Sequence, residues 1–148
     1  MKKYEFTGEV KVWLGITLHR IRAVVSFGNV EAGEQGGWIE KEENVSQDGN
    51  AWVYGNAWVY GDARVCEQSH WFSIGPIGSR LDFTTFFRTK SSEIFVSCGC
   101  FRGSIDAFAA KVKETHGENE HAKRYMVAIE MAKACIDLTP EETTDGDS

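Results

Sequence analysis

The sequence predicts a mainly β protein built around a short three-sided solenoid, followed by a C-terminal module of mixed α and β structure. Residues 44–64 read NVSQDG NAWVYG NAWVYG DAR when they are divided every six residues. Segments on either side of this repeat alternate apolar and polar side chains, as half-buried strands do. Residues 104–138 instead carry apolar side chains at helical spacing. These patterns predict strands, then a repeat, then further strands and two helices.

The six-residue period predicts short strands joined by tight corners. Each cycle begins with Asn or Asp and has Val or Ala at its second position, the fourth position is Val from Val53 on, and Gly49, Gly55 and Gly61 occupy the sixth position. This pattern matches neither the 3.6-residue period of a helix nor the two-residue period of a long strand. Three such sides would close one coil of about eighteen residues. The columns expected inside the coil are Ala51, Val53, Ala57, Val59, Ala63 and Val65.

Residues 36–65, GGWIEKEENVSQDGNAWVYGNAWVYGDARV, resemble the hexapeptide repeats of left-handed β-helix proteins, in particular small repeat proteins of bacteriophages and prophages. The resemblance is specific over roughly residues 28–65. It implies a left-handed β-helix of about two coils, and it often accompanies a trimer. It implies no reaction by itself, because fold and function separate readily.

The remaining segments are expected to protect the ends of the repeat, because so few coils bury little core on their own. Residues 4–13 and 16–27 both alternate, which predicts a hairpin at the N-terminus. The predicted division is a capping hairpin at 1–30, the left-handed β-helix at 31–72, an α+β module at 73–138 and a disordered acidic tail at 139–148.

A second hairpin and two helices make up the predicted C-terminal module. Residues 81–90 and 93–101 flank Ser91 and Ser92, and a two-residue turn there would place Phe87 opposite Val96. Ser104 suits the N-cap of a first helix that Gly117 ends, and a second helix begins near Asn119 and stops before Pro140. The helices are expected to form an antiparallel pair on the apolar side of the hairpin.

The outward positions of the repeat carry aromatic side chains, where a solvated coil would carry charge. Such a large apolar surface indicates an interface between subunits, and the resemblance favours a homotrimer. Stacking of a ligand on these rings is the alternative interpretation. The residues expected at the subunit interface are Trp52, Tyr54, Trp58 and Tyr60.

Charge and hydropathy restrict the range of partners. The net charge of −6 argues against a general nucleic-acid-binding protein, which would present a basic face to phosphates. No apolar run is long enough to cross a membrane, and no signal peptide is expected.

The cysteines lack the paired spacing of a zinc site, so Cys98 and Cys100 are expected as core thiols, with a shared metal as the alternative. These observations favour a reduced cytosolic setting, and the resemblance to phage proteins implies that this is the cytoplasm of a bacterial host.

Enzymes are considered because hexapeptide-repeat families include acyltransferases and carbonic anhydrases. The resemblance implies that such enzymes use a histidine base, or three histidines around a metal. The histidines here are His19, His70, His116 and His121, and of these His70 alone lies on the repeat. They show no metal-ligand spacing, and we therefore expect a non-catalytic protein without metal or cofactor. Whether His70 has a chemical role stays open.

Basic side chains near the second hairpin indicate an anion-binding site. The run SIGPIGSR provides backbone donors, a hydroxyl and a guanidinium, which together suit a phosphate, although it lacks the pattern of a P-loop. An ordinary turn with a surface arginine is the alternative. The residues expected to bind ligand are Gly78, Ser79, Arg80, Arg88, Lys90 and Arg102, with Phe86 or Phe95 offering a face for a base.

The resemblance to small phage proteins implies the expected function, an oligomeric, non-catalytic phage protein that counters host defence. Its expected mechanism is sequestration of a small phosphorylated, nucleotide-type immune signal. The alternatives are a protein that binds and masks a host immune protein, a hexapeptide-type acyltransferase, and a component of the virion.

Overall fold

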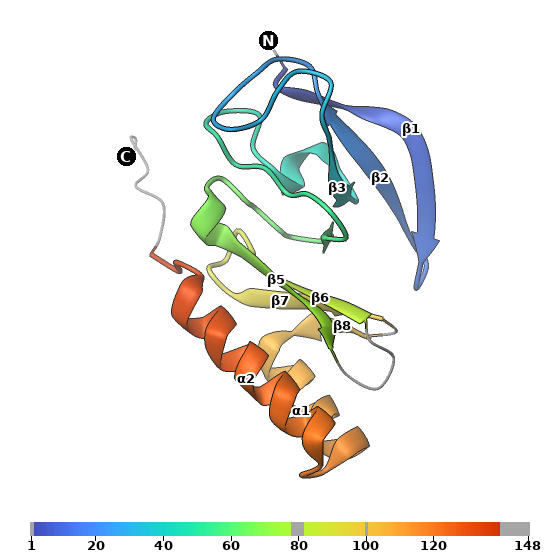
Figure 1. The fold of residues 1–148 in the computed structure, drawn as a ribbon, viewed down its shortest axis with the longest axis vertical. Coiled ribbons are helices and arrows are strands. Elements are labelled where there is room, and N and C mark those ends of the chain that lie inside the picture. The colour runs from blue at the N-terminus through green and yellow to red at the C-terminus, as the bar shows by residue number, and fades with distance from the viewer. Residues whose placement is uncertain (1, 78–81, 100, 140–148) are drawn as a thin grey trace.

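The described part of the chain forms two four-stranded sheets and a pair of helices. The computed structural model describes residues 2–77, 82–99 and 101–139. The first sheet contains β1 (Tyr4–Trp13), β2 (Ile16–Ala23), β3 (Gln35–Ile39) and β4 (Trp58–Val59), in that order. The second sheet contains β5 (Trp71–Ile77), β6 (Asp82–Arg88), β7 (Ile94–Cys98) and β8 (Phe101–Ser104), also in order. The second sheet lies between the first sheet and the helices α1 (Ile105–His116) and α2 (Glu120–Cys135) (Figure 1).

The prediction of a left-handed β-helix of about two coils is wrong. A β-helix stacks parallel strands on every side, but β3 is paired antiparallel with β2 on one edge. On its other edge β3 pairs in parallel with β4 at only two positions, Trp38 with Trp58 and Ile39 with Val59. One further isolated parallel bridge joins Val45 to Val65. The repeat therefore supplies one short strand and a series of turns to a mixed sheet.

The prediction that the Ala and Val columns point inward is confirmed. Their side chains lie in one core cluster, which also receives residues from the hairpin of β1 and β2, including Leu18 and Ile21. This hairpin was correctly predicted: a two-residue turn at Leu14 and Gly15, both with positive φ, joins its strands. The column residues are each 0 to 3% exposed: Ala51, Val53, Ala57, Val59, Ala63 and Val65.

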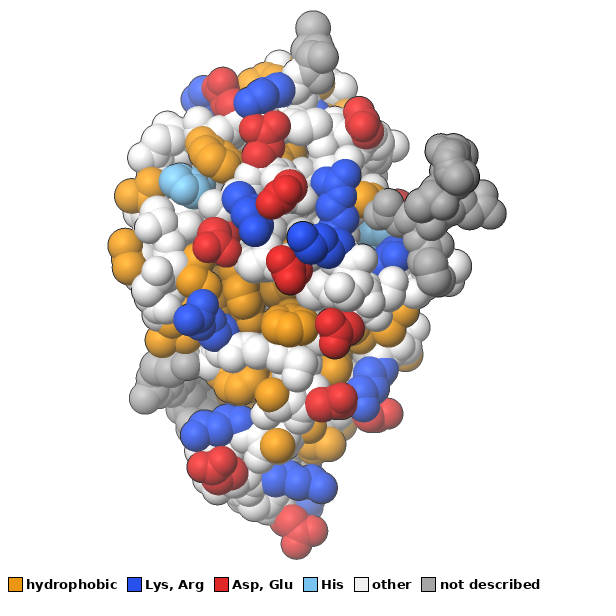
Figure 2. Space-filling view, turned by 180° about the vertical axis from the view of Figure 1, so that it is seen from behind, with side chains coloured by type: hydrophobic (Ala, Val, Ile, Leu, Met, Phe, Trp, Pro, Cys, Tyr) orange, Lys and Arg blue, Asp and Glu red, His pale blue; other side chains and the backbone are white. Residues whose placement is uncertain are grey.

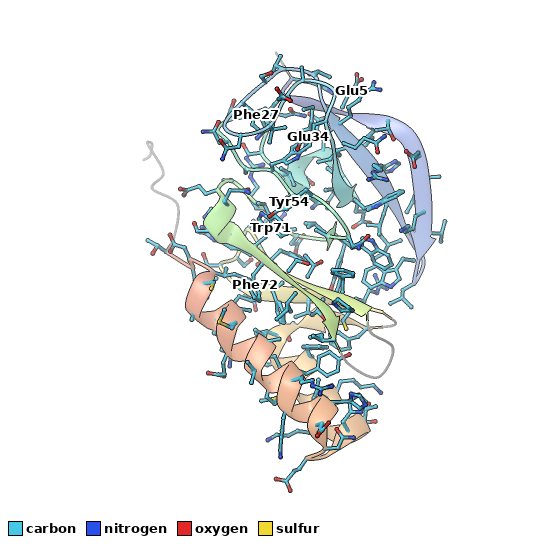
Figure 3. All side chains as sticks on the ribbon, in the orientation of Figure 1. Glu5, Phe27, Glu34, Tyr54, Trp71 and Phe72 are labelled. Carbon is cyan, nitrogen blue, oxygen red and sulfur yellow. The ribbon has the colours of Figure 1, made fainter. Side chains whose placement is uncertain are left out.

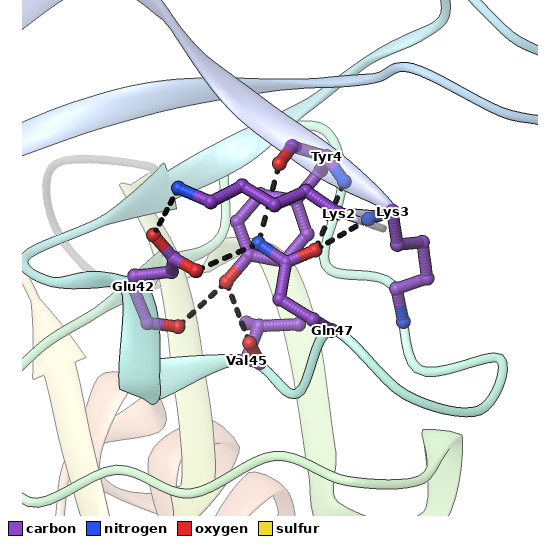
Figure 4. Close-up of polar contacts among 6 residues, drawn as sticks. All are labelled: Lys2, Lys3, Tyr4, Glu42, Val45 and Gln47. Atoms are coloured by element: carbon purple, nitrogen blue, oxygen red, sulfur yellow. Dashed lines mark hydrogen bonds and ion pairs between the residues drawn. The ribbon is translucent and has the colours of Figure 1, made fainter.

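The N-terminus is attached to the repeat by polar contacts (Figure 4). The Gln47 side chain accepts hydrogen bonds from the backbone N–H groups of Lys3 and Tyr4, at 2.6 and 3.1 Å, and donates to the Tyr4 carbonyl. The Tyr4 hydroxyl lies 2.6 Å from the carbonyl oxygen of Glu42 and 2.5 Å from that of Val45. These contacts anchor the start of β1 against the core.

The register of the second hairpin differs by one residue from the prediction. Phe87 pairs with Phe95, and Phe86 pairs with Val96. The shift arises in the turn, where Ser92 has a positive φ and the Thr89 hydroxyl accepts hydrogen bonds from the backbone of Ser91 and Glu93. A turn longer than two residues moves every pair by one and so exchanges the two faces of the strand.

As a result, both faces of the second sheet are buried. Phe86 packs in a cluster with residues of both helices, among them Phe108 and Ile129. Phe87 belongs to the cluster of the repeat, where its ring lies 5.1 Å from that of Tyr60. The second sheet therefore joins the two cores.

The helices begin where they were predicted to begin. The Ser104 hydroxyl accepts a hydrogen bond from the Ala107 N–H, and the Asn119 side chain accepts one from the Ala122 N–H. The predicted acidic tail, apart from Thr139, lies outside the described residues.

Candidate anion-binding groove

A groove of about 550 Å³ lies where a corner of the repeat meets the turn after β6. The two segments are bonded to each other, because the Arg64 N–H donates to the Arg88 carbonyl and the Lys90 N–H donates to the Asp62 carbonyl, at 3.0 and 2.9 Å. A bridge between Ala63 and Thr89 completes this contact. The groove is lined by Lys41, Glu43, Gly61, Asp62, Ala63, Arg64, Arg88, Thr89, Lys90 and Ser92.

Arg88 is the most firmly held cation of the groove. The residue is 4% exposed, its Nη1 lies 2.8 Å from His70 Nε2, and its Nη2 donates to the Ser92 hydroxyl at 3.3 Å. His70 is 1% exposed, and its Nδ1 accepts hydrogen bonds from the backbone N–H groups of Cys66 and Glu67. The imidazole therefore links the turn before β5 to the end of β6.

The other three cations of the groove are less buried. Lys41 lies 3.4 Å from a Glu43 oxygen, and Lys90 lies 3.8 Å from an Asp62 oxygen, with every one of these side chains at least 44% exposed. Arg64 Nη1 donates to the Glu43 carbonyl oxygen at 3.1 Å. Exposed ion pairs contribute about 1 kcal/mol or less, so these cations can turn toward a bound anion at small cost.

Four cations and two carboxylates line the groove, which gives it a formal charge of +2 in a protein of net charge −6. The Thr89 and Ser92 hydroxyls add groups that can donate hydrogen bonds. A compact polyanion such as a phosphate suits this combination of guanidinium, ammonium and hydroxyl groups.

The structure brings together part of the predicted ligand-binding set. Arg88 and Lys90 line the same groove. Arg102 lies on β8, exposed and outside this groove. Gly78, Ser79 and Arg80 lie outside the described residues. The predicted stacking face of Phe86 is wrong, because that side chain is 0% exposed.

Sequence reasoning missed Lys41 and Arg64. Their position depends on the parallel contacts of the structure, which place residues twenty positions apart side by side, as in Trp38 with Trp58 and Val45 with Val65. The six-residue period of the sequence does not give this spacing. This spacing brings the segment around Lys41 next to the corner at Asp62. The interval of about eighteen residues assumed for an ideal coil gives a different alignment.

The aromatic side chains of the repeat are only partly exposed. The prediction that all four project outward is wrong for Trp52 and Tyr60, which are 2% and 6% exposed inside the chain. Trp58 is half-buried, with its ring 5.2 Å from that of Trp13. Tyr54 is 53% exposed, and its ring lies edge-on to that of Trp71 with ring centres 5.1 Å apart. The two residues are labelled in Figure 3.

These two rings belong to a second groove. Its volume is about 580 Å³, and it is bounded by the repeat on one side and by β5 on the other. Its lining includes Tyr54, Trp71, Phe72 and Phe83. Whether Tyr54 or Trp58 contacts another subunit stays a prediction.

Other predicted features can be placed on the structure. Cys98 is buried, where it receives a hydrogen bond from Thr84 Oγ1, and Cys100 lies outside the described residues. Within the described ranges, no group of three His, Cys, Asp or Glu side chains is placed to hold a metal. The helices of the described chain are too short or too polar to cross a membrane. On the face shown in Figure 2, basic and acidic side chains are intermixed.

Comparison with known proteins gives one short similarity. An uncharacterized acetyltransferase of Escherichia coli K12, YdcK, is 35% identical over 62 residues. The match covers 36% of this chain and 19% of that protein, so the chain spans only about a fifth of the length of the relative it matches. No family model and no solved structure matches the chain. The similarity therefore covers one segment of the chain, and the matched protein is an acetyltransferase by its name alone.

Proposed function

We propose that this protein is a non-catalytic binding protein of a phage or prophage, which takes up a small phosphorylated ligand of the nucleotide type in the groove at Arg88. By removing such a ligand from solution it would counter a defence signal of the host. The observation that carries the proposal is the gathering of four cations and two hydroxyls around one groove, from separate segments of the chain.

The fixed position of Arg88 supports binding. A guanidinium held by His70 and Ser92 loses little conformational freedom when it meets an anion, so less of the binding free energy is spent on ordering it. A guanidinium has more N–H groups than these two contacts use, so some remain to donate to a phosphate oxygen. Lys41, Arg64 and Lys90 are more exposed than Arg88, so their side chains can reorient. They would contact the anion from the rim of the groove.

The phage origin and the role against host defence rest on the sequence resemblance of residues 28–65. The groove supports only the class of ligand. The overall negative charge favours a small ligand over DNA or RNA, because a long polyanion would be repelled outside the groove.

Calorimetry tests the proposal with the full chain and a panel of cyclic and linear nucleotides, with inorganic phosphate as the simplest probe. We expect micromolar or tighter binding of at least one nucleotide. Arg64→Ala and Lys90→Ala should each weaken it about tenfold, because each removes one charge-assisted contact. Arg88→Lys keeps the positive charge but loses the planar guanidinium group with its several N–H donors, and it should weaken binding further.

Lys111→Ala is the matched control, since it removes an exposed cation from α1 far along the chain from the groove. It should leave the affinity unchanged. Absence of heat across the whole panel would contradict sequestration, and co-purification of a host protein would then favour the masking alternative.

An acyltransferase is the second candidate, and the similarity to YdcK favours it. His70 is the histidine of the repeat, but it is 1% exposed, and both ring nitrogens already face N–H groups of the chain. This arrangement gives a substrate little access to the ring. Steady turnover of acetyl-CoA by the purified protein, abolished in His70→Gln, would support this candidate over the binding protein.

A further inference from the structure

The chain leaves α2 beside the histidine that holds Arg88. The end of α2 lies next to the start of β5 (Figure 1). There the Asp137 N–H donates a hydrogen bond to the Ser69 carbonyl oxygen at 2.9 Å. Ser69 precedes His70 in the sequence, and His70 Nε2 lies 2.8 Å from Arg88 Nη1. The segment that follows Thr139 therefore begins close to the groove at Arg88.

The carboxyl group of Asp137 already interacts with these cations. Its pKa is lowered, mainly by hydrogen bonds from Thr139 and in smaller part by the positive charges of His70 and Arg88. Charges in solvent interact only weakly beyond about 8 Å at physiological ionic strength. Carboxylates that follow Asp137 in the chain are therefore attracted toward the same cations.

Residues 140–148 supply such carboxylates. This segment reads PEETTDGDS and lies outside the described residues. Pro140 is its one apolar side chain. A segment of this composition buries little apolar surface, so ionic contacts are the main interactions that it can make. Its four acidic residues are Glu141, Glu142, Asp145 and Asp147.

The groove at Arg88 matches this segment in charge and lies within its reach. The lining of the groove carries a formal charge of +2, and its exposed cations can turn toward an anion. An extended chain spans up to about 3.5 Å per residue, so the nine residues after Thr139 reach up to about 30 Å. A segment tied to the protein this closely has an effective concentration in the millimolar range, so even weak ionic contacts are occupied for much of the time.

We propose that residues 140–148 bind in the groove of their own chain when no ligand is present, with their carboxylates on Lys41, Arg64 and Lys90. The inference names a regulation of the proposed ligand site, and as to competition with ligand it rests on the proposed function. A ligand must displace the segment, so more ligand is needed to fill the groove. A phosphate monoester can do this, because it carries about 1.5 to 2 negative charges on one compact group.

Carbodiimide cross-linking of the full chain tests the contact without any ligand. The reagent joins a carboxylate to a nearby amine, and mass spectrometry of the monomer fraction identifies the joined pairs. We expect residues 140–148 to be joined to Lys41 or Lys90 about fivefold more often than to Lys123. Lys123 is an exposed cation of α2, about 20 Å along the helix from Asp137, and so lies within reach of the segment. Equal yields at the three lysines would overturn the proposal.

The two lysines of the groove also provide internal standards. Lys41 lies 3.4 Å from a Glu43 oxygen and Lys90 lies 3.8 Å from an Asp62 oxygen, so cross-links within these pairs show that both amines react. At about 1 M salt, where charges are screened over about 3 Å, cross-links from residues 140–148 to either lysine should fall to the level at Lys123. Persistence of the preferred cross-links at this salt concentration would contradict an ionic contact.

Neutralising the segment tests the regulation. The variant Glu141→Gln/Glu142→Gln/Asp145→Asn/Asp147→Asn should bind inorganic phosphate, or a nucleotide of the panel, about tenfold more tightly at low salt. The control makes the same change of charge at exposed positions on and between the helices: Glu114→Gln/Glu118→Gln/Glu120→Gln/Glu130→Gln. It should change the affinity by about twofold or less. An equal gain in the two variants would reflect net charge alone and would overturn the proposal.

The two measurements separate this inference from the proposed function. Preferred cross-links to Lys41 or Lys90, without ligand binding by the protein or by the neutralised variant, would support the contact and contradict the proposed function. Ligand binding that neutralisation leaves unchanged, without preferred cross-links, would contradict the contact and support the proposed function.

Discussion

His70 and Arg88 lie in direct contact inside the protein, with Nε2 of the imidazole 2.8 Å from Nη1 of the guanidinium. The other ring nitrogen accepts hydrogen bonds from the backbone of Cys66 and Glu67. The histidine therefore closes a turn and supports the arginine that lines the groove. Its main role in this geometry is to position Arg88.

Replacement of His70 by alanine should lower the free energy of unfolding by about 2–4 kcal/mol, because it leaves a cavity and removes the acceptor of two backbone N–H groups. Urea denaturation followed by circular dichroism measures this loss. His19→Ala is the comparison, since His19 is partly exposed and its ring stacks mainly on Phe6. It should cost about 1 kcal/mol or less, and an equal loss in the two variants would contradict the structural role of His70.

The burial of Trp52 predicts a large effect of its removal. Its ring packs against Phe27 and Tyr4, with ring centres 5.4 and 6.3 Å apart. Trp52→Ala should therefore destabilise the protein by about 3–5 kcal/mol. Tyr54→Ala, two residues along and mostly exposed, should cost about 1 kcal/mol. If the two substitutions had equal effects on thermal unfolding, the internal position of Trp52 would be wrong.

Gly36 lies where no side chain fits. A Cβ at this position would lie 2.7 Å from Cζ2 of Trp52 and from the Val53 carbonyl oxygen. Gly36→Ala should lower the free energy of unfolding by about 3 kcal/mol, because β3 and the repeat must move apart to admit the new Cβ. Gly33→Ala is the matched change: its φ of +93° carries a strain of about 1–2 kcal/mol, but no atom lies within 4 Å of the new Cβ. Denaturant titration of both variants should show the larger loss at Gly36.

The buried phenol of Tyr60 should lower the free energy of unfolding at alkaline pH. Burial raises the pKa of Tyr60 to about 12, from an ordinary value of 10.0, against smaller opposing effects of the Gly103 N–H and the Arg102 charge. The folded state thus holds the phenol proton more tightly than the unfolded state does. The stability that this provides is fully present below pH 10 and is lost as the pH rises toward 12.

Tyr60→Phe should therefore flatten the fall in unfolding free energy between pH 10 and pH 12, measured by urea titration at each pH. Burial also raises the pKa of Tyr4, so part of the fall should remain in this variant. A profile for Tyr60→Phe that is parallel to that of the unsubstituted protein would contradict the effect of burial.

The local elements were largely predictable from sequence. The turn at Leu14 and Gly15 and the helix caps at Ser104 and Asn119 follow from short-range chemistry, since each depends on a few neighbouring residues. The inward direction of the Val and Ala columns followed from the six-residue period for the same reason. Of the candidate site, sequence reasoning found Arg88 and Lys90 but could not connect them with Lys41 and Arg64, which lie more than twenty positions earlier.

By itself, then, the sequence determined which side chains are apolar, where turns and helices begin, and which basic residues were candidates for an anion. Only the tertiary structure decided that β3 pairs antiparallel with β2, that Trp52 and Tyr60 lie inside the chain, and that β6 is covered on both faces. The physical reason is that a periodic pattern reports local geometry, whereas strand pairing and burial depend on segments far apart in the chain. A single additional residue in the turn at Ser92 was enough to exchange the faces of Phe86 and Phe87.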